Sequence, residues 1–573
     1  MLSVDEVRTL EESRVGGVPD TVLSDAGDYL LRACRQYLLA LFGRGCGKTA
    51  VEGASVRKLN VTLRTRGAVR GSMAGYGDTL QAQLLDAVAK AARDDRFSGP
   101  LAVADLGLVT IELWVQTSSR YVSALKRVSP DALRIGQEGV EVELDGKGAY
   151  YKPSVALTAP YLTSDALFAA LCRKAGIAED AWRTEECQLW ATEWIHYSED
   201  LQHQPCHMLA LRPTRLSALN RNDVLKSVRQ SADYLVANQF GSGYFCYKYL
   251  PFQDTVVRGD GNPVRASGCA YAMCALAANR ETTNESYLSS ALRASAAILE
   301  RHITLAPDSI YISDPSLEAK PGGRLGTSAL LLLGLLELRS KTAQYDSVAD
   351  ALARGIKAAQ RDDGLFRCSF GTCPESASSI NFFPGQALLA FAVMAASGDE
   401  SCRSSMKAAF RPYRDHFRSA PTTAFVGWHA DAWARAANLE QNAEYADFVF
   451  EQIDWLLTHQ IRDSSRGLYD GGFMRGGDPP NSSSIVFAEA LARATALAHR
   501  AGDDRWEAYR EALMSALTFV ARLCLNDSQA AFFPRPDRTR GGVVRSITNF
   551  EIRADVVQHL ITLYLALLED DLL

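Results

Sequence analysis

The spacing of hydrophobic residues changes character near residue 220. Before that point, stretches with helical spacing mix with short strand-like runs and with turn signals such as Arg66-Gly67 and Asp145-Gly146. The predicted helices cover 25–41, 80–93 and 164–175, and the predicted strands cover 60–64, 108–115, 139–143 and 149–152. Because strands and helices do not alternate in the rhythm of a parallel sheet, the pattern predicts an α+β domain.

After residue 220 the pattern is almost purely helical. The predicted helices cover 222–238, 266–279, 285–303, 325–340, 344–360, 384–397, 400–418, 429–437, 440–459, 484–501, 504–525 and 552–570. Helices such as 442–459 are charged and amphipathic, whereas helices such as 327–338 are apolar on every side. An amphipathic helix buries one face, but a uniformly apolar helix must be buried nearly all round. The alternation therefore predicts six hairpins in an outer and an inner ring, an all-α (α/α)6 toroid.

A short phrase also recurs in this half. A helix that ends in glutamine is followed by a glycine turn and then by aromatic residues: Gln239 precedes Gly243, Gln360 precedes Gly364, and Gln460 precedes Gly467. Such recurrence is typical of a repeat that is built from helical hairpins.

Length and composition set the domain plan and the classes of partner. A chain of 573 residues exceeds what one hydrophobic core usually serves, so at least two domains are expected. We predict the α+β domain over 1–205, a linker over 206–220 and the toroid over 221–573. Hydrophobic residues at 47% and charged residues at 22% are typical of a folded chain. The net charge of −6 offers no attraction to nucleic acid or to an anionic membrane, so neither is expected as a partner.

The sequence also indicates a compartment. No stretch approaches the roughly 20 apolar residues that a membrane helix needs. Asp5 and Glu6 stand where a secretory signal would carry positive charge, so we expect a cytoplasmic protein. Its 12 cysteines are irregularly spaced and are expected to be reduced thiols in that compartment.

If all inner helices begin at the same end of the toroid, their first residues line one mouth. These segments carry most of the unusual polar residues of this half: Arg265, Arg324, Gln386, His429, Asp431, Arg553, Asp555 and His559. Aromatic residues nearby would wall the mouth: Tyr244, Tyr247, Tyr249, Phe383 and Trp428. Capping explains each polar residue singly, but polar or aromatic residues at all six mouths favour a ligand-binding bowl. Helix N-termini add partial positive charge, which favours an anionic ligand.

The mouth residues suit two kinds of chemistry. Hydrolysis of a glycosidic bond needs two carboxylates, for which Asp431 and Asp555 are the available pair. Proton abstraction beside a carbonyl or carboxylate needs a base, such as a histidine, and a cation that holds the developing charge. The candidate catalytic residues are Asp555, Asp431, His429, His559 and Tyr247, and the candidate substrate-binding residues are Arg265, Arg324, Arg553, Trp428, Tyr244, Phe383 and Gln386.

Four segments of the first half, 60–71, 91–97, 136–151 and 167–176, resemble the AMMECR domain family. The signature of that family is Leu-Arg-Gly-Cys-Ile-Gly, which here reads Val69-Arg70-Gly71-Ser72-Met73-Ala74. Because the cysteine is replaced by Ser72, the thiol chemistry proposed for relatives is not expected. The resemblance implies a rigid domain that docks a protein partner. The alternative is an altered enzyme site around Arg70 and Ser72.

The second half resembles the six-hairpin toroids of carbohydrate-active enzymes, in segments such as 385–391 and the closing 541–559. Glycoside hydrolases, uronate lyases, uronyl epimerases and sugar 2-epimerases share this architecture, which does not itself fix the reaction. We therefore expect a carbohydrate-active enzyme that acts on an acidic sugar or glycan by lyase, epimerase or hydrolase chemistry. Two alternatives stay open: a non-catalytic scaffold, and an enzyme that modifies a peptide or a natural product.

Two motif-like segments carry little weight. The segment 43–49 looks like a phosphate-binding loop, but the first glycine of that motif would fall on Phe42. His203, Cys206 and His207 have metal-ligand chemistry, but no fourth ligand is apparent. We therefore predict neither a metal site nor a cofactor.

Overall fold

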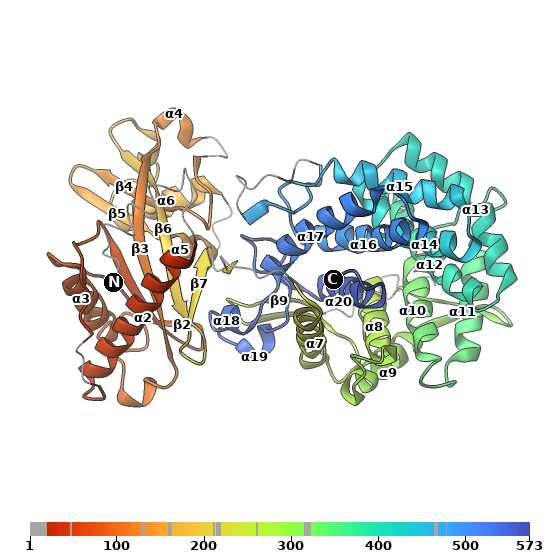
Figure 1. Cartoon of the computed structure of the whole chain (residues 1–573), viewed down its shortest axis with the longest axis horizontal. Helices are drawn as coiled ribbons and strands as arrows, with labels where there is room; N and C mark the ends of the chain where they lie inside the picture. Colours follow the sequence, from red (N-terminus) through yellow and green to blue (C-terminus); the bar gives the residue numbers. More distant parts are fainter. Residues whose placement is uncertain are drawn as a thin grey trace.

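The computed structural model describes residues 20–45, 49–128, 132–158, 163–209, 212–213, 219–258, 262–314, 322–462, 468–476 and 478–573. These residues form two domains, an α+β domain on the left of Figure 1 and a ring of helices on the right. The predicted fold class is confirmed for both domains.

An antiparallel sheet is the centre of the first domain. Its strand order is β2-β1-β3-β6-β4-β5, and β7 and β8 extend it beside β6. The strands cover Leu59–Thr65 (β1), Ala68–Ala74 (β2), Val109–Tyr121 (β3), Gly139–Leu144 (β4), Lys147–Tyr151 (β5), Gln188–Glu199 (β6), Pro205–Leu209 (β7) and Arg212–Pro213 (β8). Helix α3 (Leu80–Ala92) packs on β1 and β2, and α2 (Asp20–Leu41) packs beside α3 on β3, β6 and β7. Helix α6 (Ser164–Ala175) packs on β4 and β5. The domain therefore has two separate hydrophobic cores.

The predicted helices and strands of this domain are confirmed. The pattern missed β2, which follows the predicted turn at Arg66-Gly67, and it also missed β6. That strand lies inside the sheet and carries buried polar residues, among them His196, Ser198 and Glu199. Because buried polar residues hide the usual alternation, the strand could not be recognised from hydrophobic spacing. The linker predicted over 206–220 is wrong in part, since β7 and β8 continue the sheet through residue 213.

Twelve long helices of the described chain form the second domain. The inner helices are α8 (Pro263–Ala278), α10 (Leu325–Leu338), α12 (Phe383–Ala396), α14 (Thr423–Glu440), α16 (Ser483–Ala501) and α20 (Ala554–Glu569). The outer helices are α7 (Arg221–Ala237), α9 (Glu285–Leu299), α11 (Asp346–Ala358), α13 (Glu400–Ser419), α15 (Ala443–Leu457) and α17 (Arg505–Leu523). Each inner helix packs against the next, and α20 packs against α8, so the ring is closed. The predicted toroid is confirmed.

One stretch, Ala377–Ala396, is long and apolar enough to cross a membrane by length and composition. It contains α12, which lies between α10 and α14 in the inner ring. Most of α12 is buried inside the domain, and burial on all sides accounts for its composition.

The recurrent glutamines clamp neighbouring outer helices together. Gln239 donates from Nε2 to the carbonyl oxygens of Gly243 and Ser290, which joins α7 to α9 (2.9 and 3.0 Å). Gln360 bonds Gly364 and Ser405 in the same way and joins α11 to α13. Gln460 bonds Gly471 and Ala512 and joins α15 to α17. The predicted repeat is therefore real, but its third glycine is Gly471 rather than Gly467, which lies outside the described residues.

The two domains meet where the sheet reaches the segment between α17 and α20. The ring of His196 packs edge-on against Phe532, with ring centroids 5.7 Å apart. Gly67, in the β1–β2 turn, lies so close to Phe533 that a Cβ would come within 2.1 Å of its carbonyl carbon. Leu157, from α5 (Pro153–Thr158), joins the hydrophobic core of the toroid. Figure 1 shows α18 (Asp527–Ala530) on the side of the ring that faces the sheet.

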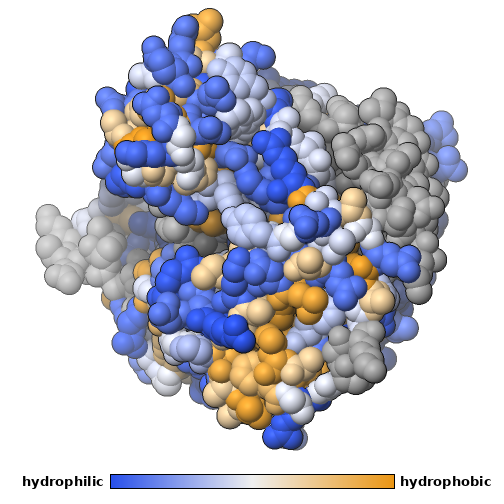
Figure 2. All heavy atoms as spheres, turned by 90° about the vertical axis from the view of Figure 1, so that its left-hand side faces the viewer, coloured by the Kyte–Doolittle hydropathy of each residue, from blue (hydrophilic) through white to orange (hydrophobic). Residues whose placement is uncertain are grey.

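The face of the first domain that points away from the toroid is shown in Figure 2. Apolar residues gather on the lower part of this face, and hydrophilic residues cover much of the rest. No contact in the structure tests the predicted docking of a protein partner, which stays a prediction.

Candidate functional site

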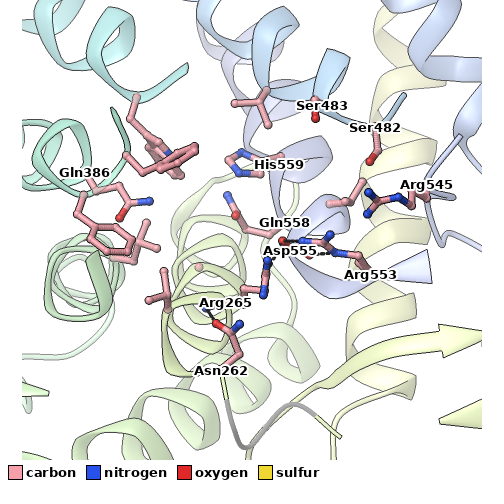
Figure 3. Close-up of a pocket in the computed structure, with 18 of the residues that line it drawn as sticks. Asn262, Arg265, Gln386, Ser482, Ser483, Arg545, Arg553, Asp555, Gln558 and His559 are labelled. Carbon is pink, nitrogen blue, oxygen red and sulfur yellow. Dashed lines mark hydrogen bonds and ion pairs between the residues drawn. The ribbon is translucent and has the colours of Figure 1, made fainter. Parts of the chain in front are cut away.

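A cavity of about 510 Å³ opens at the end of the toroid where the inner helices begin. Every inner helix contributes to it, either from its first turns or from the residues just before it. The lining residues are Asn262, Val264, Arg265, Gly268, Arg324, Leu330, Phe382, Phe383, Gln386, Trp428, Arg475, Asp478, Asn481, Ser482, Ser483, Val486, Arg545, Arg553, Asp555, Val556, Gln558 and His559. Figure 3 shows the labelled polar side chains of this set around one space.

Asp555, in the first turn of α20, is held by two arginines. Arg553 donates from Nε to Oδ1 of Asp555 at 3.0 Å, and Arg265 of α8 donates from Nε to Oδ2 at 2.9 Å. Both guanidinium groups also lie over the ring of Tyr247. Burial alone would raise the pKa of Asp555, but the two arginines lower it below its usual value. The carboxylate therefore stays ionised and orients the arginines instead of delivering a proton.

Arginines outnumber carboxylates in the cavity. Its lining carries five arginines but only Asp478 and Asp555 as acids. Arg324 is paired with Asp314, at 3.1 Å from Nε to Oδ2. Within the described chain, neither Arg475 nor Arg545 has a carboxylate partner. The cavity is thus positively charged overall, and two of its guanidinium groups are available to an anion.

His559 lies one turn further along α20 and points into the cavity (Figure 3). Its Nδ1 is 2.9 Å from Oε2 of Glu489 on α16. The ring also packs beside Trp428, with centroids 5.2 Å apart. The contact with Glu489 orients the ring and directs Nε2 away from that carboxylate.

Two buried glutamines face the same space. Gln386 is 4% exposed, and its Oε1 has no hydrogen-bond partner in the described chain. Only glycine fits at position 326, because a Cβ there would lie 2.4 Å from Oε1 of Gln386. A Cβ at position 268 would likewise lie 3.0 Å from Oε1 of Gln558. A buried polar atom without a partner costs about 1–3 kcal/mol.

The structure brings together most of the predicted site residues, but His429 and Asp431 are not at the mouth. The helix was predicted to begin near residue 429, but α14 begins at Thr423, so both side chains lie inside the ring. His429 is fully buried and stacks on Phe425, with centroids 3.7 Å apart, and burial lowers its pKa to about 3. It belongs to the packed core.

Asp431 faces the opposite end of the toroid. It pairs with Arg435 and Arg493, and Arg493 also contacts Asp570, which follows α20. Because a helix rises about 1.5 Å per residue, the 15 residues between Asp555 and Asp570 span ~22 Å. Asp431 and Asp555 therefore do not form a pair that could flank one bond.

Two predicted aromatic residues lie outside the cavity lining. The hydroxyl of Tyr244 donates to the carbonyl of Ala297 on α9 at 3.3 Å and accepts from Arg301, so it packs against the outer ring. Tyr247 lies under Arg265 and Arg553 and supports them from behind. The substrate-binding role expected for Tyr244 is therefore wrong, and Tyr247 acts on the site through the arginines.

Sequence reasoning missed Arg475, Asp478, Arg545 and Gln558. Gln558 could have been found, because it precedes His559 on a helix that was already placed at the mouth. Arg475 and Arg545 lie in glycine-containing loops before α16 and α20, and only the fold shows that these loops turn inward.

In the first domain the two candidate residues face different partners. Arg70 pairs with Asp105, at 3.3 Å from Nη2 to Oδ2. The Oγ of Ser72 lies 2.9 Å from Oγ1 of Thr62. Arg70 and Ser72 thus contact different partners, and the altered enzyme site around them stays a prediction.

The weak motifs gain no support. Within the described ranges, no three His, Cys, Asp or Glu side chains gather as a metal site. His203 contacts Arg35, whereas the side chains of Cys206 and His207 lie outside the described part of the chain. Residues 46–48 of the segment that looks like a phosphate loop lie outside it as well.

Residues 47–194 match the AMMECR1 family. A protein of Methanococcoides burtonii is 30% identical over 139 residues, which are 24% of this chain and 68% of that protein. A protein of Thermoplasma volcanium is 28% identical over 109 residues, which are 19% of this chain and 54% of that protein. The chain thus spans between about half and two thirds of the length of these curated relatives.

Solved structures resemble each domain separately. An uncharacterised protein of Pyrococcus horikoshii has a TM-score of 0.29 and 20% identity, covering 32% of this chain and 98% of that chain. A cellobiose 2-epimerase of Bacillus thermoamylovorans has a TM-score of 0.44 and 12% identity, covering 60% of this chain and 99% of that chain. A D-mannose isomerase has a TM-score of 0.48 and 11% identity, covering 62% of this chain and 100% of that chain.

Proposed function

Because the chain belongs to the AMMECR1 family through its N-terminal domain, we propose that the toroid adds a separate activity, that of a carbohydrate-active enzyme on an acidic sugar or glycan. The observation that carries the proposal is the excess of arginines in a cavity at the mouth of the inner helices. A uronate carboxylate would bind two guanidinium groups through charge-assisted hydrogen bonds.

The rest of the cavity suits a saccharide. The rings of Phe383 and Trp428 offer apolar faces, on which the C–H face of a sugar can stack. Gln386, Gln558 and Asn262 offer amide groups that can bond hydroxyls. A few polar groups among apolar walls is the usual composition of a small-molecule site.

Proton abstraction suits the geometry better than hydrolysis does. Asp555 is ionised and bound to two arginines, and Asp431 lies inside the ring beside Arg493, so the carboxylate pair predicted for hydrolysis does not meet in the cavity. His559, oriented by Glu489, is the base available to remove a carbon-bound proton beside a carbonyl or carboxylate. Lyase or epimerase chemistry is therefore the form of the activity that we propose.

The first test is binding. Isothermal titration would compare D-glucuronate, D-galacturonate and D-mannuronate with D-glucose, D-galactose and D-mannose. We expect at least one uronate to bind more tightly than its neutral hexose. Arg545→Gln should weaken that binding about 10- to 100-fold, because a charge-assisted hydrogen bond is worth about 1.5–3 kcal/mol. The exposed Arg354 of α11 lies outside the cavity, and Arg354→Gln is the control.

The second test separates binding from chemistry. Proton NMR in deuterium oxide would follow exchange of the carbon-bound hydrogens of the bound uronate. His559→Gln should bind as the wild type does and lose the exchange at least 100-fold, as expected for removal of a general base. If no uronate binds better than its hexose, the acidic-sugar proposal is wrong, and if exchange persists without His559, its role as base is wrong.

A further inference from the structure

A chain of hydroxyl and amine groups crosses one face of the N-terminal sheet. Thr62 of β1 and Ser72 of β2 are direct cross-strand partners. Their hydroxyl oxygens are 2.9 Å apart, and both also lie within hydrogen-bonding distance of Oδ1 of Asn60. The amine of Lys152, which follows β5, reaches Oγ1 of Thr62 and lies 3.1 Å from Oδ1 of Asn60. Lys152, Thr62 and Ser72 are therefore connected in one line.

The surroundings of Lys152 disfavour its charged form. The side chain is only 8% exposed, and burial disfavours a charge. Glu112 is the nearby carboxylate, but it is bonded to Arg64 and is 3.9 Å from the amine. Two cations thus share one buried carboxylate, and one of them is an arginine, which does not lose its proton.

Other charged groups act on the same amine. His196 of β6 is buried against Trp114, with ring centroids 3.8 Å apart, and burial lowers its pKa to about 3, so it is neutral. Burial lowers the pKa of Lys152 to about 7; Glu112 opposes this shift, while Arg64 and Lys174 of α6 add to it. A large share of Lys152 is therefore an unprotonated amine at neutral pH.

The other end of the line is open to solvent. Thr62 is 1% exposed, whereas Ser72 is half-buried. Two contacts hold the backbone of Ser72: its N–H donates to Oδ2 of Asp94 at 3.0 Å, and Arg96 donates to its carbonyl at 2.7 Å. Ser72 is thus a fixed hydroxyl at the surface end of a buried relay whose inner end is a base.

From this arrangement we propose that Ser72 is a nucleophile that accepts an acyl group from an activated ester or thioester. Lys152 takes up the proton through Thr62. The Oγ of Ser72 forms a bond to the acyl carbon, and the bond from that carbon to the leaving oxygen or sulfur breaks. The proton of Ser72 passes to Thr62 as the proton of Thr62 passes to the amine of Lys152, and the leaving group departs as an anion or is then protonated by Lys152. In a second step water attacks the acyl carbon, the bond from that carbon to Oγ of Ser72 breaks, and a carboxylic acid leaves while Oγ regains a proton from the water.

The test uses the full chain and p-nitrophenyl acetate as the acyl donor. Release of p-nitrophenolate would be followed by absorbance, and the acetylated residue would be mapped by mass spectrometry of peptides. We expect acetyl-Ser72, absent from Ser72→Ala and still present in Ser98→Ala, which changes an exposed serine two residues after Arg96. The rate at Ser72 should rise with pH and level off above about pH 7, as Lys152 loses its proton.

A second pair of variants distinguishes the relay from a structural network. Lys152→Met and Lys152→Arg both remove the base, and both should slow acetylation of Ser72 at least 10-fold and abolish its pH dependence. Thermal unfolding of each variant checks that the protein still folds. Thr62→Val removes the hydroxyl that connects Ser72 to Lys152, so it tests the relay independently of the lysine. If Ser72 is acetylated no faster than Ser98, or if Thr62→Val and both Lys152 variants react as fast as the wild type, the proposal is overturned.

Discussion

At the scale of single residues, burial decides whether a polar side chain can reach a ligand or only packs in the core. His559 and His429 have the same ring, but one points into a cavity beside Glu489 and the other is enclosed by aromatic rings. For His429 the pKa is lowered from 6.5 to about 3 by burial. The unfolded chain therefore binds a proton below about pH 6.5 that the folded chain cannot bind, so stability is lost as the pH falls.

This loss can be measured. Between pH 7.5 and pH 5.0, His429 should account for a fall of about 2 kcal/mol in the free energy of unfolding. His429→Phe removes the titrating group, so urea unfolding at the two pH values should show a smaller difference for the variant. The exposed His302 is the matched control, since His302→Gln should keep the wild-type difference. An unchanged difference in His429→Phe would contradict a neutral buried ring.

At the scale of elements, the glutamine clamps explain the spacing of the outer helices. Each clamp also needs a glycine with positive φ, at Gly243, Gly364 and Gly471. At Gly364 a Cβ would lie 2.2 Å from the carbonyl oxygen of Ala408 on α13, so the turn presses directly on the next outer helix. The repeat is therefore a structural device and does not mark the ligand site.

Loss of one clamp should weaken the toroid. Gln360→Ala leaves the carbonyls of Gly364 and Ser405 without their donor, at a cost of about 1–3 kcal/mol in urea unfolding of the toroid. The exposed Gln344, in the loop before α11, is the control, and Gln344→Ala should change stability by less than about 0.5 kcal/mol. Equal effects of the two changes would argue against the clamp.

At the scale of the whole molecule, the two domains are joined by close packing at the β1–β2 turn. Gly67 has a φ of 75° and lies against Phe533, whereas Gly146, in the β4–β5 turn, has a φ of 76° and open space around it. Alanine at either position meets the same backbone strain, but only at Gly67 does it meet the other domain.

A comparison of alanine variants at the two glycines therefore separates the effect of the domain contact from the effect of backbone strain. Gly67→Ala should loosen the junction and speed hydrogen exchange of residues 526–535 about 10- to 100-fold, because overpacking costs about 1–3 kcal/mol. Gly146→Ala should leave exchange in that segment unchanged. Equal exchange in both variants would mean that the turn does not hold the domains together.

The sequence by itself determined the long helices of both domains and four strands of the sheet. Helical spacing located all twelve long toroid helices, and the contrast between amphipathic and uniformly apolar helices separated the outer ring from the inner ring, because composition follows burial. Three of the five arginines, with His559 and Asp555, could be placed at one mouth on the same grounds, since they stand where inner helices begin.

Only the tertiary structure decided which polar residues share a space. His429 and Asp431 stand six and eight residues after Thr423, about two turns into α14, so the true start of the helix places both side chains inside the ring. Arg475 and Arg545 enter the cavity from loops whose paths depend on long-range packing. The line from Ser72 through Thr62 to Lys152 depends on the pairing of β1 with β2 and on the position of the end of β5. Lys152 is about 80–90 positions from Ser72 and Thr62 in the sequence, and the local hydrophobic pattern does not predict contacts over such a separation.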